Sequence, residues 1–193
     1  MKTLDADGLR ALVVRACERM GARRLDAEHV ALSLVKANLC GYDSHGVFRL
    51  AQYHTWWKQG LLKPAAQPAL AEERGFAVLV DGHLAFGQVV ARFASQAAVR
   101  KAQRGGVAVV TAKNSNHVGR LADVVEIVKE AGLIGFAAVN DSGAGQCVVP
   151  YGGMDGRLST NPIAAGVPGG DGPGLLFDFS TSAAAAGKVR QLL

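Results

Sequence analysis

The chain has 193 residues, a hydrophobic content of 49% and a charged content of 19%, values typical of a globular protein with one core. No continuous apolar run approaches the length of a transmembrane helix, so we expect no membrane contact. The net charge is +5, but the basic residues are scattered rather than interleaved with aromatic residues. This scatter argues against a nucleic-acid interface.

The N-terminus and the cysteines indicate the compartment. Asp5 and Asp7 stand where a signal peptide would have its apolar core. The three cysteines, Cys17, Cys40 and Cys147, have no metal-binding spacing, and Cys17 falls on the apolar face of a predicted helix. We therefore expect a cytoplasmic protein with buried free thiols.

The first predicted element is an amphipathic helix. One apolar stripe at helical spacing consists of Leu9, Leu12, Val13, Ala16, Cys17 and Met20. Asp5 or Asp7 can cap the start of this helix, and Gly21 can end it. Asp26 is expected to cap a second helix, which ends before Gly41.

A third helix is predicted to begin near Ser44 and to end at Gly60. Beyond Pro64 the pattern changes to alternating strands and helices. The expected elements are a strand at 76–82, a helix at 88–104, a buried strand at 107–111, a helix at 120–131, a buried strand at 133–140 and a strand at 175–179. This alternation predicts an α/β fold in which an N-terminal helical layer, residues 1–66, precedes a sheet domain, residues 67–193.

Residues 41–53 contain the most informative pattern, because a hydroxyl, an imidazole and a guanidinium occur there within six positions: Ser44, His45 and Arg49. Spaced four apart on a helix, His45 and Arg49 would share one face. An imidazole can exchange a proton with a carbinol oxygen, and a guanidinium can hold a carboxylate. The alternative is a solvated helix face on which Ser44 serves only as an N-cap.

A second imidazole, His117, lies between a predicted strand and a predicted helix. The start of that helix is a natural anion site, and Gly119 allows a ligand to approach the backbone closely. The alternative for His45 or His117 is a histidine with a purely structural role, which we favour strongly for the remaining three, His29, His54 and His83.

Three other site classes lack support in the sequence. The nearest match to a Rossmann phosphate loop, at 143–148, lacks the third glycine and is followed by Pro150 instead of a helix. There is no GxSxG elbow, and Ser44 and His45, being adjacent, are not expected to form a nucleophile pair. No HExxH or CxxC motif occurs, so we predict no metal site.

Several motifs in one order resemble a known family. They are DSHG at 43–46, SNHVG at 115–119, PYGG at 150–153, TNPIA at 160–164, DFSTS at 178–182 and GKV at 187–189. Together they resemble the malate/L-lactate dehydrogenases that are unrelated to the Rossmann-type enzymes. The resemblance implies a non-Rossmann, mixed-sheet NAD(P)-binding domain and a hydride transfer between NAD or NADP and C2 of a small 2-hydroxy/2-keto acid. It also implies a homodimer.

The resemblance assigns roles to particular residues. Ser44, His45 and His117 would be catalytic, with His45 ranked slightly ahead of His117 as the proton donor or acceptor. Arg49, Thr160 and Asn161 would bind the substrate. The cofactor would contact His117, Val118, Gly119, Arg120, Leu121, Asp141, Asp178, Phe179 and Ser180.

Two departures from the family pattern limit this assignment. Lys188 stands where cyclic-imine reductases carry an acidic residue, which favours the hydroxy-acid members. The helix-forming end of the chain has no stop signal, so the sheet domain is expected to be incomplete. The alternatives are a cyclic 2-imino acid reductase and a catalytically inactive fragment that acts as a binding module.

Overall fold

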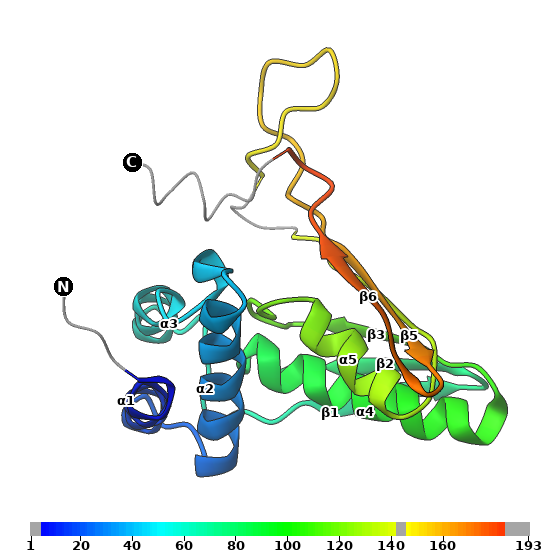
Figure 1. Cartoon of the computed structure of the whole chain (residues 1–193). Coiled ribbons are helices and arrows are strands. Elements are labelled where there is room, and N and C mark those ends of the chain that lie inside the picture. Colours follow the sequence, from blue (N-terminus) through cyan, green and yellow to red (C-terminus); the bar gives the residue numbers. More distant parts are fainter. Residues whose placement is uncertain (1–4, 142–145, 184–193) are drawn as a thin grey trace. The chain divides into compact units, whose positions relative to one another are not determined.

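The computed structural model describes residues 5–141 and 146–183, which form two compact units, Met1–Arg120 and Leu121–Leu193 (Figure 1). The first unit contains α1 (Ala6–Arg19), α2 (Arg24–Leu39), the short 3₁₀ helix η1 (Asp43–His45), α3 (Arg49–Lys58), β1 (Ala69–Arg74), β2 (Ala77–Asp81), α4 (Gly87–Gly105) and β3 (Val109–Lys113). The second contains α5 (Ala122–Glu130), β4 (Gly135–Ala138), β5 (Ile163–Gly169) and β6 (Gly172–Phe179).

The predicted limits of the first helix are confirmed, whereas the predicted cap of the second is wrong. The Asp5 carboxylate accepts a hydrogen bond of 2.6 Å from the Gly8 amide at the start of α1, and Gly21 follows its end with a φ of 97°. Asp26 lies inside the first turn of α2, where it pairs with Arg23 and accepts from Gln67. A carboxylate engaged by two side chains in this way does not cap the helix.

One hydrophobic core joins all the helices of the first unit. It includes Val13 of α1, Leu34 of α2, Tyr53 of α3, and Phe86 and Val89 at the start of α4. The expected division between 1–66 and 67–193 is therefore not where the structure divides. Burial of apolar side chains shared by α1, α2, α3 and α4 makes the helical layer and the first sheet one unit.

The predicted third helix is interrupted, and this corrects the geometry expected of His45 and Arg49. His45 ends η1, whereas Arg49 is the first residue of α3, so the two do not lie on one helix. Asn38 stabilises the break, because its side chain donates to the Asp43 carboxylate and accepts from the Val47 amide at 2.9 Å. A Cβ on Gly46 would lie only 2.2 Å from the Asn38 oxygen, which explains the glycine there.

The sheet of the first unit has the order β1-β2-β3, with an antiparallel first pair and a parallel second pair. The strand β1 was not predicted, because its side chains are all exposed and give no apolar pattern. The strand β3 was predicted to be buried, but most of it is exposed. It lies at an edge of the sheet. An apolar sequence indicates that a strand can be buried, but it does not show that another element packs over it.

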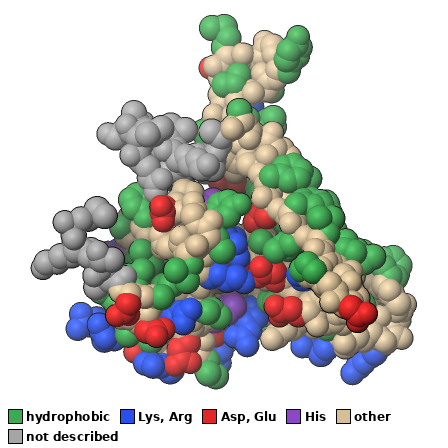
Figure 2. Space-filling model, viewed as in Figure 1, with side chains coloured by type: hydrophobic (Ala, Val, Ile, Leu, Met, Phe, Trp, Pro, Cys, Tyr) green, Lys and Arg blue, Asp and Glu red, His purple; other side chains and the backbone are tan. Residues whose placement is uncertain are grey.

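The second unit is an antiparallel sheet of order β4-β5-β6 with α5 packed on it. A Cβ on Gly166 would lie 3.0 Å from the Val125 carbonyl oxygen, so α5 lies close to β5. The predicted burial of the strand at 133–140 is wrong, since Ile134 and Phe136 are exposed. Figure 2 shows hydrophobic side chains along the strands of this unit. The strand β5, within a glycine-rich stretch, was missed.

The cysteines only partly match the expectation. Cys17 is buried in the core, and burial raises the pKa of its thiol to about 12. Cys40 and Cys147 are exposed, which corrects the prediction of buried thiols. Within the described part of the chain, no helix is both long and apolar enough to cross a membrane.

Two loops of the first unit are tied together. The Leu84 amide donates to the Asn114 carbonyl at 2.8 Å, and the Asn116 side chain donates to the Leu84 and Ala85 carbonyls. His83, Leu84 and Asn114 all have positive φ, and such strained backbone persists only where surrounding contacts hold it. The loop that carries His117 is thus attached to the start of α4.

We predict that Gly87→Ala will destabilise the protein and displace this loop. A Cβ on Gly87 would lie 2.2 Å from the carbonyl oxygens of both Asn116 and His117, so the backbone must move. We expect a loss of about 1–3 kcal/mol in the free energy of unfolding, measured by urea denaturation. The control is Gly105→Ala at the other end of α4, where a Cβ meets nothing within 4 Å. Equal effects of the two substitutions would contradict the prediction.

Candidate active site

The short helix η1 holds Ser44 and His45 together. Ser44 is only 4% exposed, and its Oγ lies 3.1 Å from Nδ1 of His45. Ser44 therefore interacts with a neighbouring imidazole and does not act as the N-cap of α3, whose first residue is Arg49. The turn of η1 folds these two adjacent side chains toward each other, and the expectation that they form no nucleophile pair stays a prediction.

Arg49 points back from α3 toward η1. Its Nε donates to the Ser44 carbonyl oxygen at 2.6 Å, and its Nη1 donates to Oε1 of Gln52 at 2.7 Å. These two contacts fix the guanidinium plane beside Ser44 and His45. The expected proximity of His45 and Arg49 is thus present, although it arises across a break between two helices.

His117 lies beside His45, with the ring centroids 5.4 Å apart and the ring planes inclined by 31°. Its Nδ1 is 2.8 Å from the hydroxyl of Tyr53 in α3. Its Nε2 is buried and has no hydrogen-bond partner within the described residues. The structure therefore brings together His45, His117 and Arg49, which lie up to 72 positions apart in the sequence.

Both imidazoles are held in the neutral form. Burial, followed by the charges of Arg49 and Arg120, lowers the pKa of His45 from 6.5 to about 4. Burial, Arg49 and His45 together lower the pKa of His117 well below its ordinary value. One guanidinium thus acts on both rings, and a bound anion next to Arg49 would offset that effect.

The sequence did not reveal Tyr53 and Gln88. Tyr53 is 1% exposed and Gln88 is 2% exposed, and the Gln88 side-chain amide donates to the Tyr53 hydroxyl at 2.7 Å. A tyrosine on an apolar helix face is usually a core residue, so its spacing gave no signal. A buried glutamine at the start of a helix was the only available hint.

The rest of the segment after His117 is structurally constrained. Gly119 has a φ of 84°, and a Cβ there would lie 3.0 Å from Oγ of Ser33. Arg120 is 7% exposed, and its guanidinium lies 5.9 Å from the ring centroid of Tyr42. Val118, which lies between His117 and Gly119 in the sequence, is partly buried. These three residues belong to the same unit as the two histidines.

The remaining predicted site residues lie in the second unit. Leu121 immediately precedes α5, and Asp178 Oδ2 accepts from the Ala122 amide at 2.8 Å in the first turn of that helix. This oxygen of Asp178 therefore stabilises the start of the helix, and the predicted contact of Asp178 with the cofactor stays a prediction. A negative charge at a helix N-terminus is favourable.

Thr160 and Ser180 are joined across two segments of this unit, because the Ser180 hydroxyl donates to the Thr160 carbonyl at 3.1 Å. Asn161 has a φ of 38°, and its Oδ1 is buried without a hydrogen-bond partner in the described part of the chain. Phe179 is half exposed, and its ring centroid lies 5.6 Å from the ring centroid of Phe177.

Asp141 is exposed, beyond the end of β4. Lys188 and the GKV motif lie outside the described residues, as do the glycines of the rejected phosphate loop at 143–145. No cluster of three or more His, Cys, Asp or Glu side chains suited to a metal ion occurs among the residues that the structure describes.

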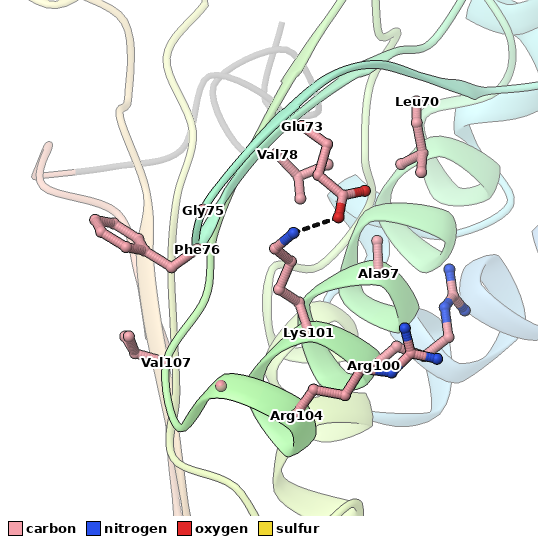
Figure 3. A pocket seen from close by; sticks show the side chains of 11 residues that line it. Leu70, Glu73, Gly75, Phe76, Val78, Ala97, Arg100, Lys101, Arg104 and Val107 are labelled. Atoms are coloured by element: carbon pink, nitrogen blue, oxygen red, sulfur yellow. Dashed lines mark hydrogen bonds and ion pairs between the residues drawn. The ribbon is translucent and has the colours of Figure 1, made fainter.

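A separate pocket of about 490 Å³ lies between the β1–β2 hairpin and the C-terminal half of α4 (Figure 3). Its lining residues are Leu70, Glu73, Gly75, Phe76, Val78, Ala97, Arg100, Lys101, Arg104, Gly105 and Val107. The Lys101 ammonium pairs with the Glu73 carboxylate across it. None of the predicted site residues lines this pocket, so it is distinct from the histidine pair.

The low pKa of His45 predicts a loss of stability in acid. Unfolding returns the ring to its ordinary pKa of 6.5, so between pH 6.5 and about 4 the unfolded chain binds more protons than the folded one. The stability that the neutral His45 ring contributes is fully present above pH 6.5 and is lost as the pH falls through 4. We expect His45→Asn to reduce the loss measured between pH 7 and pH 4 by about 2 kcal/mol. The control is His54→Asn, because His54 is exposed. The prediction would be refuted if the free energy of unfolding changed equally with pH in the unaltered protein, in His45→Asn and in His54→Asn.

Comparisons with known proteins point to one family. A family profile described as malate/L-lactate dehydrogenase matches residues 4–193. Hydroxycarboxylate dehydrogenase B of Escherichia coli O157:H7 is 38% identical over 186 residues, which cover 96% of this chain and 51% of that protein. L-sulfolactate dehydrogenase of Methanocaldococcus jannaschii is 33% identical, over 98% of this chain and 54% of that protein.

Solved structures give the same result. Malate dehydrogenase from Pyrococcus horikoshii OT3 superposes with a TM-score of 0.91 at 33% identity, covering 98% of this chain and 53% of that one. The chain therefore spans about half the length of the relatives that it matches. Within that span, the profile match and the fold agree that this chain belongs to the malate/L-lactate dehydrogenase family.

Proposed function

We propose that the protein is a 2-hydroxyacid dehydrogenase that uses NAD or NADP. The observation that carries the proposal is the pair of neutral imidazoles, His45 and His117, with their centroids 5.4 Å apart and both under the charge of Arg49. A 2-keto acid has a carbonyl oxygen next to a carboxylate, so its recognition needs one cation beside polar groups that hold the oxygen. The three side chains supply these groups.

Arg49 would bind the substrate carboxylate. A guanidinium is planar and permanently charged, and its donors match the two carboxylate oxygens. Its contacts with the Ser44 carbonyl and with Gln52 restrict its orientation before the substrate binds. Such preorganisation lowers the entropic cost of holding the substrate in a reactive position.

His45 or His117 would exchange the proton of the C2 oxygen. Burial is the largest cause of the low pKa of both rings, and the charge of Arg49 is the second. Because the substrate carboxylate would offset the charge of Arg49, binding would remove this second cause and raise the pKa of both rings. A pKa nearer to the working pH is what general acid–base catalysis needs. Ser44 would orient His45 through the contact at Nδ1.

The residues present fit a nicotinamide cofactor, which would accept or supply the hydride at C2. The buried, unpaired Oδ1 of Asn161 is an acceptor suited to a carboxamide N–H group. The predicted contacts of Thr160 and Asn161 with the substrate stay part of the proposal.

Two alternatives are retained. Delta(1)-pyrroline-2-carboxylate/Delta(1)-piperideine-2-carboxylate reductase of Pseudomonas putida is 33% identical over 94% of this chain and 52% of that protein. A cyclic 2-imino acid also presents a carboxylate beside a polarised C2, so it would suit the same three side chains. The other alternative is an inactive binding module, and the homodimer likewise remains a proposal.

We predict that Arg49→Lys will weaken substrate binding more than turnover. A lysine ammonium cannot reproduce the bidentate contact, and it also loses the Nε bond to Ser44. In an assay of NADH or NADPH oxidation with pyruvate, oxaloacetate, sulfopyruvate and a cyclic 2-imino acid, KM should rise about 10- to 100-fold.

The matched control is Arg100→Lys, because Arg100 is an exposed arginine outside this site. The substrate with the largest kcat/KM would decide between a keto-acid and an imine substrate. Oxidation with none of the substrates would contradict the proposed function, and an unchanged KM in Arg49→Lys would contradict the role of Arg49.

A further inference from the structure

A continuous chain of hydrogen bonds ends at His117. The Gln88 side-chain amide donates to the Tyr53 hydroxyl at 2.7 Å, and that hydroxyl lies 2.8 Å from His117 Nδ1. A tyrosine hydroxyl has a single proton to donate. Since its oxygen accepts from Gln88, that proton is available for Nδ1, which would then be the acceptor.

The direction of this chain fixes the tautomer of His117. In a neutral imidazole only one nitrogen carries the proton, so accepting at Nδ1 places the proton on Nε2. That Nε2 is buried and has no partner among the described residues. A buried N–H donor without a partner is costly, and a ligand oxygen would satisfy it.

His45 is held differently. Its Nδ1 contacts the hydroxyl of Ser44, and this hydroxyl can rotate either to donate to the ring or to accept from it. His45 can therefore gain or lose a proton and keep the contact. In the orientation that the structure gives, the Gln88 amide N–H donates to the Tyr53 oxygen, which favours a donor role for the Tyr53 hydroxyl toward His117.

We propose that Tyr53 and Gln88 are positioning residues that hold His117 as a neutral hydrogen-bond donor at Nε2, which leaves His45 as the group that exchanges a proton with the C2 oxygen. This inference rests on the proposed function. It assigns different roles to two histidines between which the sequence gave only a slight preference for His45.

For a 2-keto acid, the carbonyl carbon would receive the hydride that the reduced nicotinamide of the proposed function supplies. The π electrons would move onto the carbonyl oxygen, which would accept a hydrogen bond from His117 Nε2–H. The oxygen takes a proton from the His45 imidazolium, so an O–H bond forms, an N–H bond breaks and His45 becomes neutral. His45 then regains a proton from solvent, whereas His117 keeps its proton throughout.

The tautomer is tested by two-bond ¹H–¹⁵N NMR of the histidine rings in the 193-residue chain, with the His117 signals assigned from His117→Gln. We expect the unaltered protein to show a bare Nδ1 and a protonated Nε2. Tyr53→Phe removes the donor and should give a mixture of tautomers. Gln88→Glu presents an acceptor to the Tyr53 hydroxyl, which should reverse the chain and move the proton to Nδ1.

Ser95→Ala is the matched control, because Ser95 is a buried hydroxyl of α4 that bonds within its own helix, to Ala91. It should leave the His117 signals unchanged. A proton on Nδ1 in the unaltered protein would overturn the inference. So would a single Nε2–H tautomer in a Tyr53→Phe protein whose circular dichroism shows it to be folded.

Turnover gives an independent readout. In Tyr53→Phe, kcat should fall on the order of 10²-fold with little change in KM, because the tautomer affects the reacting oxygen and not the carboxylate. A fixed tautomer without any activity would contradict the proposed function alone. Activity with an Nδ1–H tautomer would contradict this inference alone.

Discussion

The candidate site depends on the close approach of the start of α4 to the loop that carries His117. Gly87 leaves no room for a side chain, and the carbonyls of Asn116 and His117 lie where its Cβ would be. The next residue, Gln88, then reaches the Tyr53 hydroxyl, and Tyr53 reaches His117. One backbone contact thus sets the distance between three segments that are far apart in the sequence.

This arrangement links stability to chemistry. The side chains that position His117 belong to, or border, the core that joins α1, α2, α3 and α4. A site built on packed helices is held more rigidly than one built on loops alone. The neutral histidines are the cost of this burial, because an imidazole next to Arg49 in a desolvated place releases its proton easily.

The sequence predicted the main parts of the site but not its geometry. Residue types and motif order were enough to select Ser44, His45, Arg49 and His117. The expectation that His45 and Arg49 share a helix face was wrong, because Asn38 and Gly46 break the helix between them. Helical periodicity carries no information about such a break, which depends on a side chain six residues before Ser44.

Other features were beyond local patterns. Tyr53 and Gln88 interact across 35 positions, and no local spacing in the sequence links them. The strands β3 and β4 have apolar sequences typical of buried strands, yet each lies at the edge of its sheet. Coverage of a strand depends on the tertiary arrangement, and a one-dimensional pattern cannot supply it.

The most direct test of the central claim follows the hydride itself. The protein would be incubated with a 2-hydroxy acid that carries deuterium at C2 and with NAD⁺ or NADP⁺, and the reduced nicotinamide would be analysed by mass spectrometry and NMR. The account predicts one deuterium at C4 of the nicotinamide, and none when His45→Asn replaces the unaltered protein. Reduced nicotinamide without deuterium, or equal transfer by His45→Asn, would contradict it.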